Sequence, residues 1–416
     1  MRILLAGYGT RGDVQPLVAL GVRLRADGHD VAIAASQVFA DLVRGQGLEF
    51  HTAGGDVEAL LRRHGEVLVK HQERMLRTFL EFARAEADGL FDQTYEAARG
   101  ADLIAAGVHS AAPSVAEALG LPYRTLLFCP QMVPSRHHPP MGLPWLSLPA
   151  LCNRILWWAL RRGFHAMLGD AINRRRRAWD LPPIGDVTAH LLTDRPIVAS
   201  DALLGAPPPD ASPGIVQTGS LALAEDGPLE PALERFLAAG EPPICAGFGS
   251  MPDGDPRGTT RAVIEAFETC GRRGLILSGW AGLGEGALPP TVFVAGSAPH
   301  ARLFPRVALA VHHGGAGTTA AVARAGVPQI VVPHIADQHY WGRQVFERGL
   351  GSRPIARCAL TAAKLARAIR DVLSRPEIAD RAREIKAGLD RTDGVSTLAR
   401  HLYQVAADTR GHRVAA

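Results

Sequence analysis

Short apolar runs alternate with helix-forming segments along both halves of the chain. The helical patterns of the first half cover residues 14–28 and 110–120. The strand-like runs are 2–8, 29–36, 101–108 and 123–130 in the first half, and 242–250, 273–280, 291–297 and 308–311 in the second. Strands that alternate with helices at this spacing predict a parallel sheet covered on both faces. We therefore expect an α/β chain of two Rossmann-like, doubly wound parallel-sheet domains that face each other across a cleft.

The boundary between the halves is predicted from composition. The chain has 416 residues, enough for two domains of about 200 residues each. Its richest Pro/Gly stretch, LLGAPPPDASPG, begins at Leu203 and is typical of a linker. We predict an N-terminal domain over 1–202, a linker over 203–216, a second domain over 217–385 and a C-terminal helical segment over 386–416.

Charge and cysteine content narrow the class of protein. The net charge is +4, and no basic tract with interleaved aromatic residues is present, which argues against a nucleic-acid partner. The five cysteines form no CxxC pair, as in a reduced cytoplasmic protein. The longest apolar patch outside the strands, ILWWAL at 155–160, is too short to span a bilayer. We expect a cytoplasmic enzyme with at most peripheral membrane contact; its oligomeric state is left open.

The chemistry is concentrated in residues 311–344. Gly314, Gly315 and Gly317 form a turn that leads into a helix, and a helix N-terminus behind a glycine turn binds anions. His312 or His313 adds a donor for the same anion. Asp337 and Gln338 follow the next strand, so they reach the same edge of the sheet. This combination suits a diphosphate joined to a sugar.

The segments HHGGAGTT (312–319), RAGVPQIVVP (324–333) and ADQ (336–338) resemble the family 1 glycosyltransferases of the GT-B fold, closest to bacterial macrolide and glycopeptide antibiotic transferases and sterol glucosyltransferases. The resemblance implies a nucleotide-sugar site in the second domain, with His312 and the amides of 315–318 on the diphosphate. There His312 would also be catalytic, because these donors stabilise the leaving nucleotide as charge builds on it. Asp337 and Gln338 would bind the sugar hydroxyls. The implied donor-binding residues are Thr10, Arg11, Gly12, Gly249, Ser250, Ser297, Ala298, His312, Gly314, Gly315, Ala316, Gly317, Thr318, Asp337 and Gln338. Plant relatives have a tryptophan in place of Ser297 and a glutamate in place of Ala320, so UDP and TDP both stay open, with UDP-glucose slightly favoured.

The first glycine turn has two interpretations. Residues 7–12 match G-x-G-x-x-G, but a dinucleotide site also needs an acid after the second strand, where Ala34, Ala35 and Ser36 stand. A nicotinamide enzyme is therefore disfavoured. The resemblance implies instead that Asp13 is the general base of catalysis, with a plain helix cap as the alternative. The helix N-terminus is expected to hold the pKa of Asp13 at or below about 3.9.

The sequence also offers candidates for the acceptor site and for a metal site. Candidate acceptor-binding residues are His137, His138, Met141 and Trp157, where the two histidines are also fallback bases. The aromatic residues of 153–179 form either ordinary core or an apolar acceptor surface. Asp253 and Asp255 form a D-x-D sequence, interpreted as a turn and a helix start rather than a metal site.

Together these features predict an inverting, metal-independent transfer of a hexose from a UDP- or TDP-sugar to a hydroxyl of a lipophilic small molecule, such as a polyketide or macrolide, a sterol or a flavonoid-like aglycone. No cofactor is expected besides the sugar nucleotide. Two alternatives stay open: a non-catalytic relative that acts as a partner or activator, and a nucleotide-sugar epimerase on the same architecture.

Overall fold

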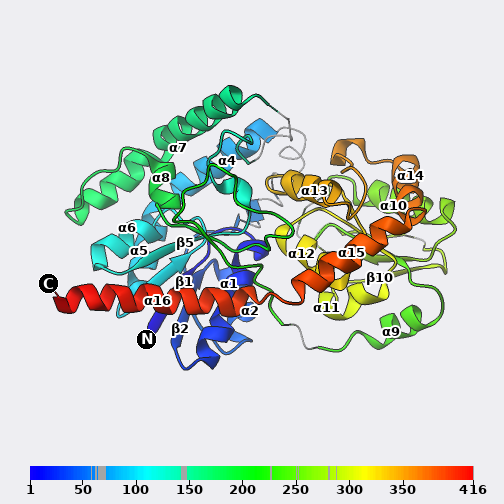
Figure 1. Cartoon of the computed structure of the whole chain (residues 1–416), viewed down its shortest axis with the longest axis horizontal. Coiled ribbons are helices and arrows are strands. Elements are labelled where there is room, and N and C mark those ends of the chain that lie inside the picture. The colour runs from blue at the N-terminus through cyan, green and yellow to red at the C-terminus, as the bar shows by residue number, and fades with distance from the viewer. Residues whose placement is uncertain are drawn as a thin grey trace.

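The computed structural model describes residues 1–57, 59–60, 63, 72–141, 148–224, 227–249, 251, 253–279, 282–286 and 288–415 (Figure 1). The chain forms two parallel sheets, one of seven strands in the order β3-β2-β1-β4-β5-β6-β7 and one of five in the order β10-β9-β8-β11-β12. Both orders reverse direction beside the first strand of their domain, as in doubly wound Rossmann-like folds. This confirms the predicted α/β class with two parallel-sheet domains.

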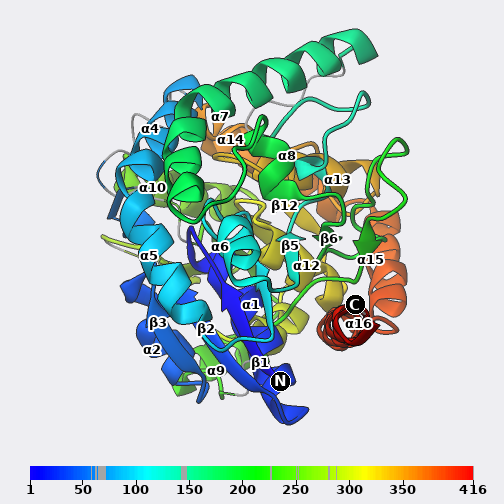
Figure 2. The same ribbon diagram turned by 90° about the vertical axis from the view of Figure 1, so that its left-hand side faces the viewer.

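The first sheet has a core on each face. Its strands are β1 (Arg2–Ala6), β2 (Asp30–Ala35), β3 (Glu49–Thr52), β4 (Leu103–Ala106), β5 (Tyr123–Leu127), β6 (Ile197–Val198) and β7 (Val216–Gln217). The helices of this domain are α1 (Arg11–Ala26), α2 (Ala40–Arg44), α4 (Gln72–Ala85), α5 (Ala87–Ala98), α6 (Ala112–Leu119), α7 (Ala150–Ala178) and α8 (Val187–Leu192). Side chains of β1 alternate between the two faces: Leu5 joins the core under α1, whereas Leu4 joins the core under α5 and α6. Figure 2 shows α4, α5 and α7 together on one side of this sheet.

The second domain repeats the arrangement on a smaller sheet. Its strands are β8 (Ile244–Gly247), β9 (Gly274–Leu277), β10 (Val292–Ala295), β11 (Leu309–His312) and β12 (Gln329–Val331). Its helices are α9 (Pro231–Ala238), α10 (Pro256–Thr269), α11 (His300–Leu303), α12 (Ala316–Ala325), α13 (Gln338–Glu347), α14 (Ala362–Leu373) and α15 (Pro376–Leu389). Ile244 and Leu275 belong to cores on opposite faces of this sheet, so it too is covered on both sides.

The chain crosses between the domains twice. Because β7 pairs with β6, the predicted linker 203–216 lies within the first domain, and the first crossing follows Gln217. A two-residue strand beside a Pro/Gly-rich stretch has no periodicity from which it could be predicted. After α15 the chain returns, and α16 (Gly394–Ala415) lies along α1 (Figure 1). There the Tyr403 hydroxyl donates to Oδ2 of Asp27 at 2.7 Å, and Leu398 enters the core of the first domain.

Candidate active site

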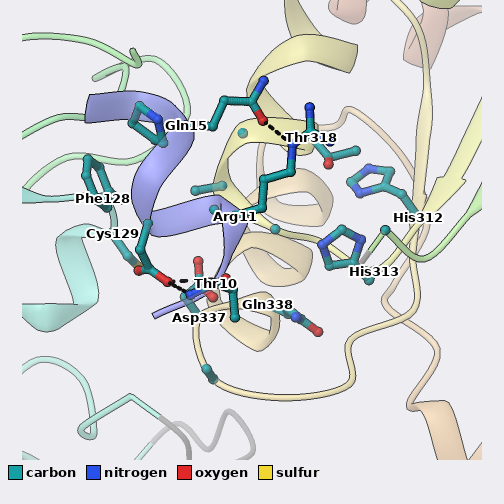
Figure 3. Close-up of a pocket in the computed structure, with 18 of the residues that line it drawn as sticks. Thr10, Arg11, Gln15, Phe128, Cys129, His312, His313, Thr318, Asp337 and Gln338 are labelled. Carbon is teal, nitrogen blue, oxygen red and sulfur yellow. Dashed lines mark hydrogen bonds between the residues drawn. The ribbon is translucent and has the colours of Figure 1, made fainter. Parts of the chain in front are cut away.

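A cleft of about 2200 Å³ is lined by the carboxyl-end loops of both sheets (Figure 3). Ligands of open α/β sheets bind at this edge. Nearly all predicted site residues line the cleft: Thr10, Arg11, Gly12, Asp13, Met141, Trp157, Gly249, Ser297, Ala298, His312, Gly315, Ala316, Gly317, Thr318, Asp337 and Gln338. Gly314 is buried behind the turn, and Ser250 lies outside the described residues. The fold therefore brings together segments that are more than 300 residues apart in the sequence.

The N-terminus of α12 opens into this cleft. Gly315 is its N-cap residue, no side chain caps the helix, and its first turn has no acidic residue. Gly314 has φ of 89°, and a Cβ there would lie 2.5 Å from Cγ1 of Val331, so only glycine fits this turn. In Figure 3 the Arg11 side chain extends from α1 toward Thr318. The arrangement presents backbone N–H groups, a positive helix end and a guanidinium to one space, which suits an anion.

His312 is held inside the second domain. Its Nδ1 accepts from the N–H of Gly314 at 3.1 Å, so its Nε2 carries the proton and donates to Oε1 of Gln329 at 2.8 Å. Burial lowers its pKa to about 4, which keeps the ring neutral. With both ring nitrogens bound by protein groups, the His312 ring has no hydrogen bond left for a diphosphate in this conformation. Its predicted donor contact stays a prediction that this geometry does not support.

His313 is the imidazole that faces the cleft (Figure 3). Its ring lies against the two glycine turns, because a Cβ on Gly249 or Gly315 would come within 3 Å of it. Its Nδ1 is buried with no hydrogen-bond partner in the structure. Burial lowers the pKa of His313 well below its usual value, so one ring nitrogen of this neutral imidazole can donate. Of the two histidines that the sequence offered, the structure presents His313 to the anion site.

Asp337 and Gln338 reach the cleft from the start of α13. Oε1 of Gln338 accepts from the N–H groups of His334 and Ile335 at 2.8 and 3.1 Å, so this amide braces the loop before it. Oδ2 of Asp337 accepts from Nε1 of Trp341 at 3.0 Å. Burial and the charge of Asp13 raise the pKa of Asp337 to about 7. Ala336, with φ of 54°, is in a strained left-handed conformation just before this carboxylate.

Asp13 lies in the first turn of α1. Its Oδ2 accepts from the N–H of Thr10 at 2.7 Å and from the Thr10 hydroxyl at 3.2 Å. The structure contradicts the expectation of a low pKa: burial raises the pKa of Asp13 above its usual value, and the bonds from Thr10 only partly offset this. The helix-cap interpretation is also correct, because Asp13 completes a capping box with Thr10. A carboxylate of raised pKa in a cleft is a better proton acceptor than the sequence suggested.

The first-domain side of the cleft is apolar. Met141 and Trp157 line it with Phe128, Met132 and Phe164. The predicted acceptor residues His137 and His138 do not: His137 is exposed, and His138 is buried with its carbonyl bonded to Nε1 of Trp157 at 3.0 Å. Two successive residues of an irregular loop point to different sides, and the sequence does not show which residue points to which side. Phe128 and Met132, which the sequence analysis missed, follow β5 at the same sheet edge.

The D-x-D residues are bound by protein groups. The Arg357 guanidinium contacts both carboxylate oxygens of Asp253, at 2.6 and 2.7 Å. Oδ1 of Asp255 accepts from the N–H of Gly258 at 2.8 Å and caps α10. The interpretation as turn and helix start is therefore confirmed, and neither aspartate lines the cleft.

Comparison with known proteins agrees with this geometry. Residues 3–135 match the glycosyltransferase family 28 N-terminal domain, and residues 278–391 match the C-terminal domain of erythromycin biosynthesis protein CIII-like proteins. The chain is 38% identical to vancomycin aglycone glucosyltransferase of Amycolatopsis orientalis over 97% of each chain. It is 32% identical to sterol 3-beta-glucosyltransferase UGT80B1 of Arabidopsis thaliana, over 95% of this chain and 66% of that one. The crystal structure of glycosyltransferase VinC in complex with dTDP shares the fold, with a TM-score of 0.73 and 20% identity over 98% of this chain and 100% of that one.

Two parallel-sheet domains with the cleft between their carboxyl edges form the GT-B fold, and the relatives identify the chain as a glycosyltransferase. More narrowly, the chain belongs to the family that includes the antibiotic glycosyltransferases of Amycolatopsis orientalis and the sterol glucosyltransferases. Across the described part of the chain, no helix has the length and apolar character needed to cross a membrane.

Proposed function

We propose that this enzyme transfers a hexose, glucose by preference, from a UDP- or TDP-sugar to a hydroxyl of a lipophilic small molecule, with inversion and without a metal ion. One observation carries the proposal: Asp13 of the first domain and the open N-terminus of α12 in the second line the same cleft. A proton acceptor and an anion site on opposite walls leave room for a sugar between them.

Asp13 is the proposed general base. Both bonds from Thr10 reach its Oδ2, so among the described residues Oδ1 is left to accept the proton of the incoming hydroxyl. The raised pKa of Asp13 suits proton transfer in the transition state better than an ordinary carboxylate would. Direct displacement by that hydroxyl turns an α-linked donor into a β-glycoside.

The proposed diphosphate site consists of the amides at the start of α12, with Arg11 and His313 beside them. These donors are fixed before the reaction and oppose the negative charge that builds on the leaving nucleotide. They supply the positive potential that a divalent ion gives other glycosyltransferases, which supports metal independence. Asp337, at the same edge, is the proposed partner of the sugar hydroxyls.

The test is turnover of UDP-glucose and TDP-glucose with a panel of polyketide, macrolide, sterol and flavonoid aglycones, with and without EDTA. We expect a β-glycoside by NMR, no effect of EDTA, and a loss of kcat of at least about 100-fold in Asp13→Asn. Conversion of the donor in the absence of any aglycone would instead identify an epimerase. Nucleotide binding without glycosylation of any aglycone would support the alternative of a non-catalytic partner protein.

A further inference from the structure

Helix α7 has two apolar faces, one turned toward the cleft of the first domain and one turned outward. Leu156, Trp157, Leu160 and Phe164 of its inner face line the cleft. On its outer face Leu151, Ile155 and Trp158 are 65%, 54% and 63% exposed, at the i, i+4, i+7 spacing of one helical stripe. Figures 1 and 2 both place α7 at the periphery of the first domain. Three large apolar side chains in a row on an outer helix indicate a docking surface.

Positive charge surrounds this stripe. Residues 150–169 include Arg154, Arg161 and Arg162 and no acidic residue. The Arg162 guanidinium lies 5.9 Å above the Trp158 ring. Arg154 makes no ion pair with any described residue, whereas Arg161 pairs with Asp186. A helix with an apolar stripe, an exposed tryptophan and flanking arginines is typical of a surface that lies in the interface of a bilayer.

A second cavity of about 670 Å³ adjoins the stripe and is also cationic. Its charged lining residues are Arg136, Arg154, Arg161, Arg162, Asp186 and Asp210. Both aspartates are already bound: Asp186 by Arg161, and Asp210 by the Ser135 hydroxyl at 2.6 Å and the N–H of Arg136 at 3.0 Å. The excess of arginine leaves this cavity suited to an anionic headgroup beside an apolar surface.

We propose that the outer face of α7 docks the enzyme on an anionic phospholipid bilayer. The charge around the stripe favours lipid over a second copy of this chain, because two copies would oppose arginine to arginine. The inner face of the same helix lines the apolar part of the cleft, so docking brings that part within one helix diameter of the lipid. Docking would let lipophilic acceptors pass from the bilayer to the cleft, an inference that rests on the proposed function. The binding of lipid itself does not depend on that function.

The experiment is co-sedimentation of the full chain with vesicles of phosphatidylcholine, alone or mixed with phosphatidylglycerol. We expect partition into the mixed vesicles that weakens as salt is raised. Ile155→Ser/Trp158→Ser and Arg154→Gln/Arg162→Gln should each lower the partition coefficient about tenfold or more. The matched control is Val38→Ser/Phe346→Ser, which alters two exposed apolar residues elsewhere and should leave partition unchanged.

Activity toward a water-soluble aglycone, measured without vesicles, shows that the variants are folded and tests the proposed function separately. Equal partition into both vesicle types, or equal partition of wild type and variants, would overturn the lipid proposal. Light scattering supplies a further check: a dimer that the Ile155→Ser/Trp158→Ser change dissociates would show that a second copy covers this face.

Discussion

The ion pair between Asp201 and Arg324 links helix α12 to the first domain, at the point where the chain crosses between the domains. Nη2 of Arg324, in the last turn of α12, lies 2.8 Å from Oδ1 of Asp201, whose side chain is 1% exposed. Ser220 of the first crossing and Thr392 of the second donate to the same carboxylate at 2.5 and 3.2 Å. Nη1 of Arg324 also donates to the carbonyl of Leu389 at 2.9 Å.

The cost of breaking this pair depends on which charge is left behind. Removing one partner of a buried pair costs about 3–5 kcal/mol in the free energy of unfolding. Asp201→Ala leaves a guanidinium that is 24% exposed and keeps its bond to the Leu389 carbonyl, so we expect a loss of about 3 kcal/mol. Arg324→Ala leaves the carboxylate buried with only hydroxyl donors, so we expect about 5 kcal/mol. The two effects should not add, because each change removes the same interaction.

Urea denaturation followed by tryptophan fluorescence measures these losses. Glu234→Ala serves as control, because the Arg306–Glu234 pair is 34% and 47% exposed and, after solvent screening, is expected to contribute no more than about 1 kcal/mol. Since the pair holds the last turn of α12, Asp201→Ala should also raise the KM for the sugar nucleotide. Losses below about 0.5 kcal/mol, strict additivity, or a greater loss from Asp201→Ala would refute the reasoning.

Three further changes test the cleft. Gly314→Ala places a Cβ 2.5 Å from Val331 Cγ1 at a positive φ, so it should abolish the thermal stabilisation that UDP gives wild type. Gln329→Leu removes the acceptor for the buried Nε2–H of His312 and should lower the free energy of unfolding in urea by about 1–3 kcal/mol. Unchanged stability would contradict this hydrogen bond. The raised pKa of Asp337 means that its protonated form stabilises the fold, a contribution that is full below about pH 4 and lost as pH rises through about 7. Asp337→Asn should therefore gain melting temperature relative to wild type between pH 5 and 8; a constant difference across that range would contradict the pKa.

Much of the fold follows from the sequence because buried parallel strands are continuous apolar runs with helices between them. The strands at 2–6, 244–247 and 292–295 all lie within predicted runs. The prediction was wrong where an element is too short to show a period. Strand β7 has two residues, and its place in the first sheet depends on pairing with β6, which is a tertiary contact. A Pro/Gly-rich stretch marks a loop, but it does not show whether that loop joins two domains or two strands of one.

The residue types of the candidate site were predictable, whereas their hydrogen-bond partners were not. Glycines at 314 and 315 identified the turn, because few other residues fit one. Which of His312 and His313 faces the anion site depends on which ring is bound by Gln329 inside the domain. The sequence hinted at this contact only by placing a polar Gln329 in an apolar strand. Likewise, the sequence placed Asp13 at a helix start and suggested a low pKa, but burial in the cleft has the larger effect.

The two cleft carboxylates are better understood as a pair than as separate residues. Asp13 and Asp337 come from opposite domains, and the charge of Asp13 helps to raise the pKa of Asp337 to about 7. Thr10 gives Asp13 two hydrogen bonds that favour its ionised form. Asp337 also accepts two, from Nε1 of Trp341 and from its own backbone N–H, but burial and the charge of Asp13 outweigh them. A pKa of about 7 leaves Asp337 partly protonated near neutral pH, which limits its repulsion of an ionised Asp13, the form that the proposed mechanism needs as a base. When Asp13 takes up the proton of the acceptor, the repulsion ends and the ionised form of Asp337 becomes easier to hold. Proton transfer in one domain thus changes the charge presented to the sugar by the other, a coupling that follows from the position of the cleft between the two sheets.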